Sequence, residues 1–200
     1  MSRLVKQSLD FLVATVALLL LAPLLACLAL AVRLGMGSPV LFRDVRPGYK
    51  GKPFVLLKFR TMDLTRDSRG HLLPDEQRLT KLGQFLRHFS LDEIPQLWNV
   101  WNGEMSLVGP RPLLMEYLGR YTPEQARRHD VKPGMTGWAQ VNGRNALSWE
   151  ERFRLDVWYV DHWSLGLDIR IILRTIRKVL LREGVSQSGH ATMPKFLGNN

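Results

Sequence analysis

The sequence predicts a small protein of mixed α/β class that is attached to a membrane through its N-terminal segment. Residues 11–32 carry no charge and are mostly apolar. After residue 36, short apolar stretches bounded by proline and glycine, which are typical of strands, are followed by stretches with helical periodicity. The 200 residues suffice for one hydrophobic core and leave little for a second domain once the apolar segment is set aside.

The apolar segment is long enough to cross a bilayer. A straight helix over residues 11–32 would measure about 33 Å, against a hydrocarbon core of about 30 Å. Pro23 lies near its middle, where proline removes an internal hydrogen bond and kinks a helix. Basic residues flank the segment on both sides, which is expected if both ends stay in the cytoplasm. The residues alone leave a membrane span and a re-entrant helical hairpin equally open. A cleaved signal fits less well, because the apolar run continues past Cys27.

Periodicity and turn residues divide the rest of the chain into elements. Residues 39–45 and 53–59 are predicted strands separated by turns. Residues 63–77 are polar and predict an exposed loop, whereas residues 132–145 predict an ordered loop or a hairpin. The predicted helices are residues 79–89, 93–101, 116–128, 148–163 and 167–182. The fourth of them can begin with a capping box, because Ser148 and Glu151 have the required spacing.

The last predicted helix is basic and amphipathic. Its apolar face consists of Ile169, Ile172, Leu173, Ile176 and Leu180. Its basic face consists of Arg170, Arg174, Arg177, Lys178 and Arg182. A helix of this kind can lie on an acidic membrane surface, although a packing helix with a solvated back has the same pattern.

The net charge of +10 indicates an anionic partner. Acidic lipid headgroups and phosphorylated substrates both fit this charge. Nucleic acid is not expected as a partner, because the basic residues are scattered and form no recognised binding motif. The single cysteine, Cys27, excludes a disulfide framework and a thiolate metal site.

Two adjacent acids, Asp92 and Glu93, are the main candidates for chemistry. On a helix their side chains would diverge by about 100°, so separate tasks are expected: one as nucleophile or metal ligand, the other assisting. The alternative is structural. Ser90 and Glu93 have the spacing of a capping box, and Asp92 itself is a suitable N-cap residue.

Several cations are placed where they could hold a phosphate. Arg111 lies between two prolines, whose stiff backbone limits the cost of ordering its guanidinium. Lys58 and Arg60 end a predicted strand, and Arg87 lies five residues before Asp92. Guanidinium and ammonium groups form strong charge-assisted hydrogen bonds with phosphate oxygens, although solvated charges at a strand end are also common.

Four motifs, in order and at family-like spacing, resemble the bacterial sugar transferases, the monotopic phosphoglycosyl transferases. The matching segments are KFRTM at residues 58–62, LDEIPQLWN at 91–99, SLVGPRP at 106–112 and KPGMTGW at 132–138. The resemblance covers nearly the whole chain.

The resemblance implies transfer of a sugar 1-phosphate from a UDP-sugar to undecaprenyl phosphate with release of UMP, the first membrane step of bacterial glycoconjugate synthesis. It implies that Asp92 is the nucleophile that holds the sugar phosphate covalently, and that Glu93 assists it. Mg²⁺ is expected as cofactor, with Asp92 as its ligand. Lys58, Arg87 and Arg111 are expected to bind the phosphate oxygens.

The same resemblance favours the re-entrant hairpin, formed by residues 1–35 and broken near Pro23. Residues 36–200 would then form a compact catalytic domain with amphipathic interfacial helices, on the cytoplasmic face of the bacterial inner membrane. The chain has Ala22 before Pro23 where family members often have serine. Residues 159–163 and 191–196 resemble the diacetylbacillosamine-phosphate transferases, so UDP-N,N'-diacetylbacillosamine is an expected donor.

Other classes fit less well. A glycerolipid acyltransferase needs a histidine and an aspartate separated by four residues, whereas three separate His88 from Asp92. A CDP-alcohol phosphotransferase would need several membrane helices and a motif of several aspartates. A membrane-anchored basic adaptor without catalytic activity remains as the alternative if Asp92 only caps a helix.

Overall fold

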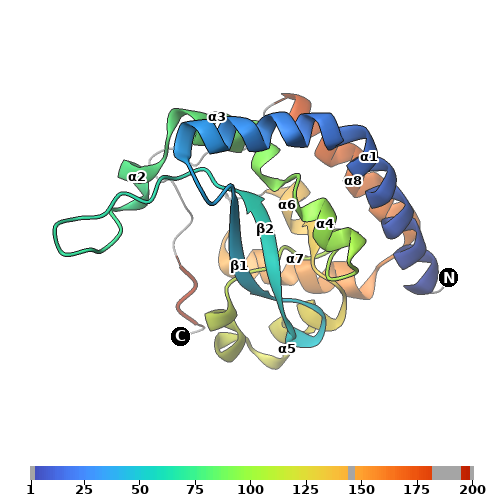
Figure 1. The fold of residues 1–200 in the computed structure, drawn as a ribbon. Coiled ribbons are helices and arrows are strands. Elements are labelled where there is room, and N and C mark those ends of the chain that lie inside the picture. Colours follow the sequence, from blue (N-terminus) through green and yellow to red (C-terminus); the bar gives the residue numbers. More distant parts are fainter. Residues whose placement is uncertain (1–2, 144–146, 182–194, 199–200) are drawn as a thin grey trace.

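The computed structural model describes residues 3–143, 147–181 and 195–198. Its N-terminal element is helix α1 (Arg3–Met36), which continues through Pro23 and bends within its length (Figure 1). The break predicted near Pro23 is therefore not an interruption of the helix. In the part of the chain that is described, α1 is the one helix long and apolar enough to cross a membrane, and 6% of its most apolar window is buried. It is thus unlike the core helix of a soluble protein.

Two small sheets follow α1. Strands β1 (Leu41–Pro47) and β2 (Pro53–Phe59) form an antiparallel hairpin, with Leu41 opposite Phe59 and the turn η1 (Tyr49–Gly51) between them. This confirms the predicted strand pair. Strands β3 (Ser106–Val108) and β4 (Gly134–Thr136) form a parallel pair.

The prediction of a loop or hairpin at residues 132–145 was wrong. The segment forms strand β4 and helix α6 (Trp138–Asn142), and its end lies outside the described residues. A Cβ on Gly134 would lie 2.0 Å from the backbone nitrogen of Gly109. This close approach is made by two glycines far apart in sequence, so local turn residues did not indicate it.

The helices of the domain are short until the C-terminal third of the chain. The first are α2 (Asp75–Arg78), α3 (Lys81–His88), the 3₁₀ turn η2 (Leu91–Glu93) and α4 (Gln96–Trp101). They are followed by η3 (Met115–Arg120), α5 (Pro123–Ala126) and η4 (Arg127–Asp130). The last are α7 (Trp149–Asp161) and α8 (Leu165–Leu181).

Most of the predicted helices are found, with one clear exception. The single helix predicted over residues 116–128 is wrong, because Thr122 caps a new helix that begins at Pro123 and splits the segment into three turns. The capping box predicted at Ser148 and Glu151 is present at the start of α7. The loop predicted over residues 63–77 contains a bridge between Arg66 and Leu72 and ends in α2.

Helix α8 packs against the core through Leu167 and Ile171, which lie outside the predicted apolar face, and through Ile172 of that face. Leu167 and Ile171 are buried, whereas Ile169, Leu173 and Ile176 of the predicted apolar face are 58%, 62% and 51% exposed. The side chain of Leu180 and all of Arg182 lie outside the described residues. The helix therefore presents an apolar stripe on its outer side.

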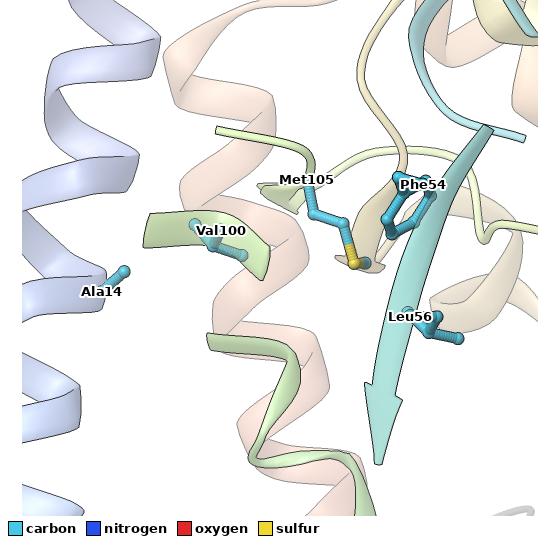
Figure 2. Packing of buried hydrophobic residues seen from close by; sticks show 5 residues of the cluster. All are labelled: Ala14, Phe54, Leu56, Val100 and Met105. Carbon is cyan, nitrogen blue, oxygen red and sulfur yellow. The ribbon is translucent and has the colours of Figure 1, made fainter. Parts of the chain in front are cut away.

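One part of the core joins α1 to the domain. Ala14 of α1 points toward Val100 of α4, and beyond it lie Met105 and the β2 residues Phe54 and Leu56 (Figure 2). A polar cluster holds the N-terminal end of α1: Lys6 donates to Asp168 of α8 at 2.6 Å.

The C-terminal end of α1 is held by Arg60, which follows β2. Its buried guanidinium donates to the carbonyl oxygens of Gly37 and Ser38, each at 3.0 Å, and to that of Met36. These carbonyls lie where a helix end leaves its last acceptors unsatisfied. Arg60, considered from the sequence as a phosphate contact, is therefore a cap for α1.

We expect Arg60→Ala to lower the free energy of unfolding by about 3 kcal/mol, because several charge-assisted hydrogen bonds to buried carbonyls are lost together. Thermal unfolding in detergent measures this, and Arg60→Lys should recover part of the loss. Arg43→Ala, on the exposed side of β1, is the matched control and should leave the midpoint unchanged. An Arg60→Ala protein as stable as the control would contradict the capping role.

Candidate active site

A cleft of about 630 Å³ lies between β2, η2 and helices α3, α6 and α7. Its volume is in the range of small-molecule sites. All the predicted site residues of the domain line it: Lys58, Arg87, Asp92, Glu93 and Arg111. Further charged residues of its wall are Asp44, Arg46, Arg60, Asp75, Arg78, Arg152 and Asp156.

The turn η2 places the two acids. Ser90 precedes it in the left-handed conformation, with φ 55°, and caps nothing with its side chain. Helix α4 begins after Pro95, again without a side-chain cap hydrogen bond. The capping box proposed for Ser90 and Glu93 is therefore absent, and Asp92 does not occupy an N-cap position. Neither acid has the structural role that was the alternative to a chemical one.

Glu93 is the centre of a charge cluster that joins distant parts of the chain. Its Oε1 accepts from Lys58 Nζ at 2.6 Å and from Arg111 Nη2 at 2.7 Å. Burial alone would raise the pKa of Glu93, but Arg111 and Lys58 outweigh burial and hold the pKa well below its usual range. Glu93 also raises the pKa of Arg111. Glu93 is therefore ionised, and it fixes both cations at the cleft.

Asp92 has a different environment from its neighbour. It is 8% exposed, and burial followed by the nearby charge of Glu93 raises the pKa of Asp92 to about 6. Lys58, Arg87 and Arg111 act in the opposite direction and favour the ionised form. At pH 7 to 8 the carboxylate is mostly ionised but poorly solvated, which are properties suited to a nucleophile.

Arg87 lies in the last turn of α3 and lines the same cleft as Asp92 and Arg111. Its Nε donates to the neutral hydroxyl of Thr61 at 3.0 Å, and its charge favours the ionised form of Asp92. Helix α3 reaches this position because Gly83 packs against the backbone of Thr61, whose carbonyl oxygen lies 1.8 Å from where a Cβ would be. The short KFRT segment thus supports both α1 and Arg87.

Two buried polar residues that support the site were missed by the sequence analysis. Asn99 of α4 is 1% exposed; its Oδ1 accepts from the backbone N–H of Leu57 at 3.0 Å, and its Nδ2 donates to the Val55 carbonyl at 2.7 Å. It fixes β2, which carries Lys58, against the helix that follows Glu93. Asn99 lies in the LDEIPQLWN motif, but nothing local indicated its backbone partners.

The second missed support is Arg128, which is 2% exposed. It donates to Asp156 of α7 at 2.7 and 3.1 Å, and to the carbonyl oxygen of Arg111 at 2.8 Å. A buried ion pair is expensive to break, so this contact fixes the backbone of the Pro-Arg-Pro segment.

His129, the residue after Arg128, is expected to make the stability of the protein depend on pH. Burial, and then the charge of Arg128, lower the pKa of His129 to about 4 from its usual 6.5. As pH falls from 6.5 to 4 the unfolded chain binds a proton that the folded chain does not, so stability falls by about 3 kcal/mol in total. Between pH 7 and pH 5 we expect the unfolding midpoint of a His129→Asn variant to fall by roughly 5 °C less than that of the unmodified protein. Equal drops in both proteins would contradict this.

The donor set at the cleft fits a magnesium ion that is shared with a substrate. Within the described residues there is no group of three or more potential metal-ligating side chains. Glu93 is engaged by Lys58 and Arg111, so Asp92 is the carboxylate best placed to bind a cation there. Mg²⁺ is commonly held by one or two carboxylates together with substrate phosphate oxygens, which agrees with this set.

A poorly solvated carboxylate beside a cation-lined cleft, on a domain joined to a helix apolar enough to cross a membrane, is the arrangement expected of an enzyme that acts on a phosphorylated compound at a membrane. The family model described as bacterial sugar transferase matches residues 1–182. The chain belongs to this family and is a transferase, which confirms the resemblance found in its motifs.

Several known proteins are similar to this chain. It is 64% identical over 168 residues to the "uncharacterized sugar transferase EpsL" of Bacillus subtilis, with 84% of this chain and 83% of the relative covered. It is 42% identical over 187 residues to the UDP-glucose:undecaprenyl-phosphate glucose-1-phosphate transferase of Escherichia coli, covering 88% of this chain and 40% of that protein. A protein of the same name from Caulobacter vibrioides is 41% identical over 190 residues, with 88% and 69% covered. The chain thus spans less than half the length of the E. coli relative.

Proposed function

We propose that this protein transfers a sugar 1-phosphate from a UDP-sugar to undecaprenyl phosphate, the first membrane step of a bacterial glycoconjugate pathway. One observation carries the proposal: Asp92 is poorly solvated, caps no helix and lies beside the cluster of Glu93, Lys58 and Arg111. The names of the E. coli and Caulobacter relatives describe this type of transfer with glucose.

The reaction would proceed in two displacements at one phosphorus atom. First, a carboxylate oxygen of Asp92 forms a bond to the β-phosphorus, and the bond from that phosphorus to the oxygen shared with the α-phosphate breaks. UMP leaves with this oxygen and its electron pair. In the second step an oxygen of undecaprenyl phosphate attacks the same phosphorus, and the bond to Asp92 breaks. The product is undecaprenyl diphosphate sugar, and Asp92 is again a free carboxylate.

The chain's own residues supply the charge for both steps. Lys58 and Arg111 are held in place by Glu93 and can stabilise negative charge on the equatorial phosphate oxygens. Arg87, which lines the same cleft and also favours the ionised form of Asp92, can do the same. Mg²⁺, held by Asp92 and substrate oxygens, would supply further charge neutralisation of the diphosphate.

The assay that tests this function measures UMP released by the detergent-solubilised protein with Mg²⁺, a UDP-sugar and undecaprenyl phosphate. A donor panel should include UDP-glucose, UDP-galactose and UDP-N,N'-diacetylbacillosamine. UDP-glucose follows the names of the E. coli and Caulobacter relatives, and UDP-galactose follows the name of another similar protein, the UDP-galactose-lipid carrier transferase of Erwinia amylovora. The third donor follows the resemblance of residues 159–163 and 191–196, of which 191–194 lie outside the described residues. Release of more than one UMP per protein molecule, with one donor and only when the lipid is present, supports the proposal. A protein inactive with every UDP-sugar would point to the non-catalytic adaptor.

We further propose that α1 is re-entrant, so that the catalytic domain lies on the cytoplasmic face of the inner membrane. The bend of α1, the basic residues at both of its ends and its contacts with the domain near both ends support this. The outward stripe of Ile169, Leu173 and Ile176 on α8 suits a helix lying at the membrane surface beside it.

Cysteine labelling in intact spheroplasts tests the topology. In a Cys27→Ser background, Ser8→Cys and Leu34→Cys place single thiols on exposed positions near the two ends of α1. If α1 is re-entrant, we expect neither thiol to react with a membrane-impermeant maleimide until the cells are lysed. Ser68→Cys, on the exposed loop, serves as the cytoplasmic control. Labelling of Ser8→Cys without lysis would show that α1 spans the membrane.

A further inference from the structure

A second cavity, of about 180 Å³, lies at the N-terminal end of α1. Its walls come from the first turns of α1, from η1, from β3, from the end of α7 and from residues 130–132. Its described lining residues are all different from those of the cleft that contains Asp92. Sites for drug-sized ligands measure about 300–1,000 Å³, so this cavity suits one small group and not a whole nucleotide sugar.

Three cations line this cavity: Arg3, Lys6 and Lys132. Lys6 is paired, since its Nζ donates to Asp168 at 2.6 Å. By contrast, neither Arg3 nor Lys132 forms an ion pair with a residue that the structure describes. Lys132 is partly buried, and burial lowers its pKa; the charge of Asp10 opposes this shift, and that of Lys6 adds to it. An anion in the cavity would stabilise the charged form of Lys132.

The two acids that line the cavity have other partners. Asp130 accepts from Lys50 Nζ at 2.6 Å. Asp10 is 7% exposed, and its Oδ1 accepts from the backbone N–H of Leu107 at 3.3 Å. The charged lining residues and their ion-pair partners comprise four cations, Arg3, Lys6, Lys50 and Lys132, and three carboxylates, Asp10, Asp130 and Asp168. This cavity is therefore suited to an anion.

The place of the cavity identifies the source of the anion. The charged residues of α1 that line it all precede Phe11, where the apolar run of residues 11–32 begins. With α1 in the membrane, as proposed, the cavity lies just outside the hydrocarbon core, for a re-entrant helix and for a span alike. Tyr49 and Trp163 also line it, and both residue types are enriched at this level of a membrane. The anions found there are the phosphate groups of lipids.

We propose that this cavity binds the phosphate of an anionic phospholipid headgroup, with Arg3 and Lys132 as the contacts to its oxygens. Guanidinium and ammonium groups form charge-assisted hydrogen bonds with phosphate. Arg3 belongs to α1, and Lys132 lies two residues before β4. A bound headgroup would therefore join the membrane helix to the domain at the end of α1 opposite to Arg60. The phosphate of the proposed acceptor reacts at Asp92, in the other cavity, so the acceptor is not the expected occupant here.

The test measures lipid binding by native mass spectrometry of the detergent-solubilised protein. The probes are phosphatidylglycerol, the zwitterionic phosphatidylcholine, undecaprenyl phosphate, and glycerol phosphate as a soluble headgroup. The variant Arg3→Gln/Lys132→Gln removes both proposed contacts. The matched control Arg43→Gln/Lys52→Gln removes the same charge from exposed positions that line neither cavity. Thermal unfolding without lipid checks that each variant is folded.

We expect phosphatidylglycerol to bind at least about tenfold more tightly than phosphatidylcholine and more tightly than glycerol phosphate, which has no acyl chains to insert. The double variant should bind phosphatidylglycerol at least about tenfold more weakly, and the control should bind it unchanged. If the double variant is unfolded, Arg3→Gln alone decides, because Arg3 is exposed; we expect it to weaken binding at least about threefold.

Four results would overturn the inference: equal binding of the two phospholipids, an equal loss in the control, glycerol phosphate binding as tightly as phosphatidylglycerol, or tighter binding of undecaprenyl phosphate that the double variant loses. The last result would assign the cavity to the acceptor. No UDP-sugar enters this measurement, so failure of the proposed transfer reaction, seen as no UMP release by the unmodified protein, is distinguishable from failure of this inference.

Discussion

Asp92→Asn is expected to lower turnover by at least about a thousandfold and to abolish the covalent adduct. Asparagine is nearly the same size and keeps a polar group in the cleft, but its amide cannot attack phosphorus. UMP release with the preferred donor and undecaprenyl phosphate measures the change. The loss should be in kcat, since the cations that bind phosphate are unchanged.

The same variant separates a chemical role from a structural one. Burial and Glu93 raise the pKa of Asp92 to about 6, so the ionised carboxylate weakens the fold at pH 8. Asn at position 92 removes that charge, and the unfolding midpoint should stay the same or rise. A variant with full activity would overturn the assignment of Asp92. A variant that is inactive and also unfolded would indicate a structural role for Asp92. It would contradict the conclusion that this residue caps no helix.

Glu93→Gln is expected to lower kcat by about a hundred- to a thousandfold, the second largest effect. The neutral amide no longer balances Lys58 and Arg111, which both donate to Glu93 Oε1. The amide can present a donor toward Arg111, so the guanidinium loses its fixed position. Loss of the Glu93 charge also lowers the pKa of Asp92 and makes it a weaker nucleophile. Time courses from quenched reactions, followed by adduct formation and UMP release, measure the loss of rate that both changes cause.

The adduct should still form in Glu93→Gln, but slowly, because the nucleophile is intact. The free energy of unfolding should fall by about 2 kcal/mol as the charge-assisted hydrogen bonds are lost. Glu124→Gln is the control, since it removes a carboxylate from an exposed pair with Arg127. Normal kcat in Glu93→Gln would mean that the cluster only holds the fold together.

Local patterns predicted the parts of the fold that depend on neighbours in sequence. The β1–β2 hairpin, the Ser148 capping box and the long apolar helix each follow from a short stretch of residues. The parallel pairing of β3 with β4 did not, because it depends on close contact between Gly109 and Gly134. Helix α8 was predicted, but its burial was not: periodicity identifies an apolar face without telling whether protein or lipid covers it.

The candidate site was likewise predicted only in the part that depends on short motifs. Its charged residues were predicted from motifs, and the structure places Lys58, Arg87, Asp92, Glu93 and Arg111 around one cleft. Their roles in catalysis remain predictions. The hydrogen bonds from Arg60 to the end of α1 were not predicted, because a strand-end arginine gives no sign that a helix end lies within its reach. Asn99 and Arg128 were missed, since their partners are backbone groups and a carboxylate far away in sequence.

The most direct test of the proposed mechanism is an intact-mass measurement on the solubilised protein, incubated with Mg²⁺ and each UDP-sugar but without lipid acceptor. We predict a mass gain equal to one sugar phosphate with the correct donor, located at Asp92 and missing in Asp92→Asn. Adding undecaprenyl phosphate should then remove it. If a donor supports UMP release in the presence of lipid but never adds mass in its absence, transfer is direct and the covalent mechanism is wrong.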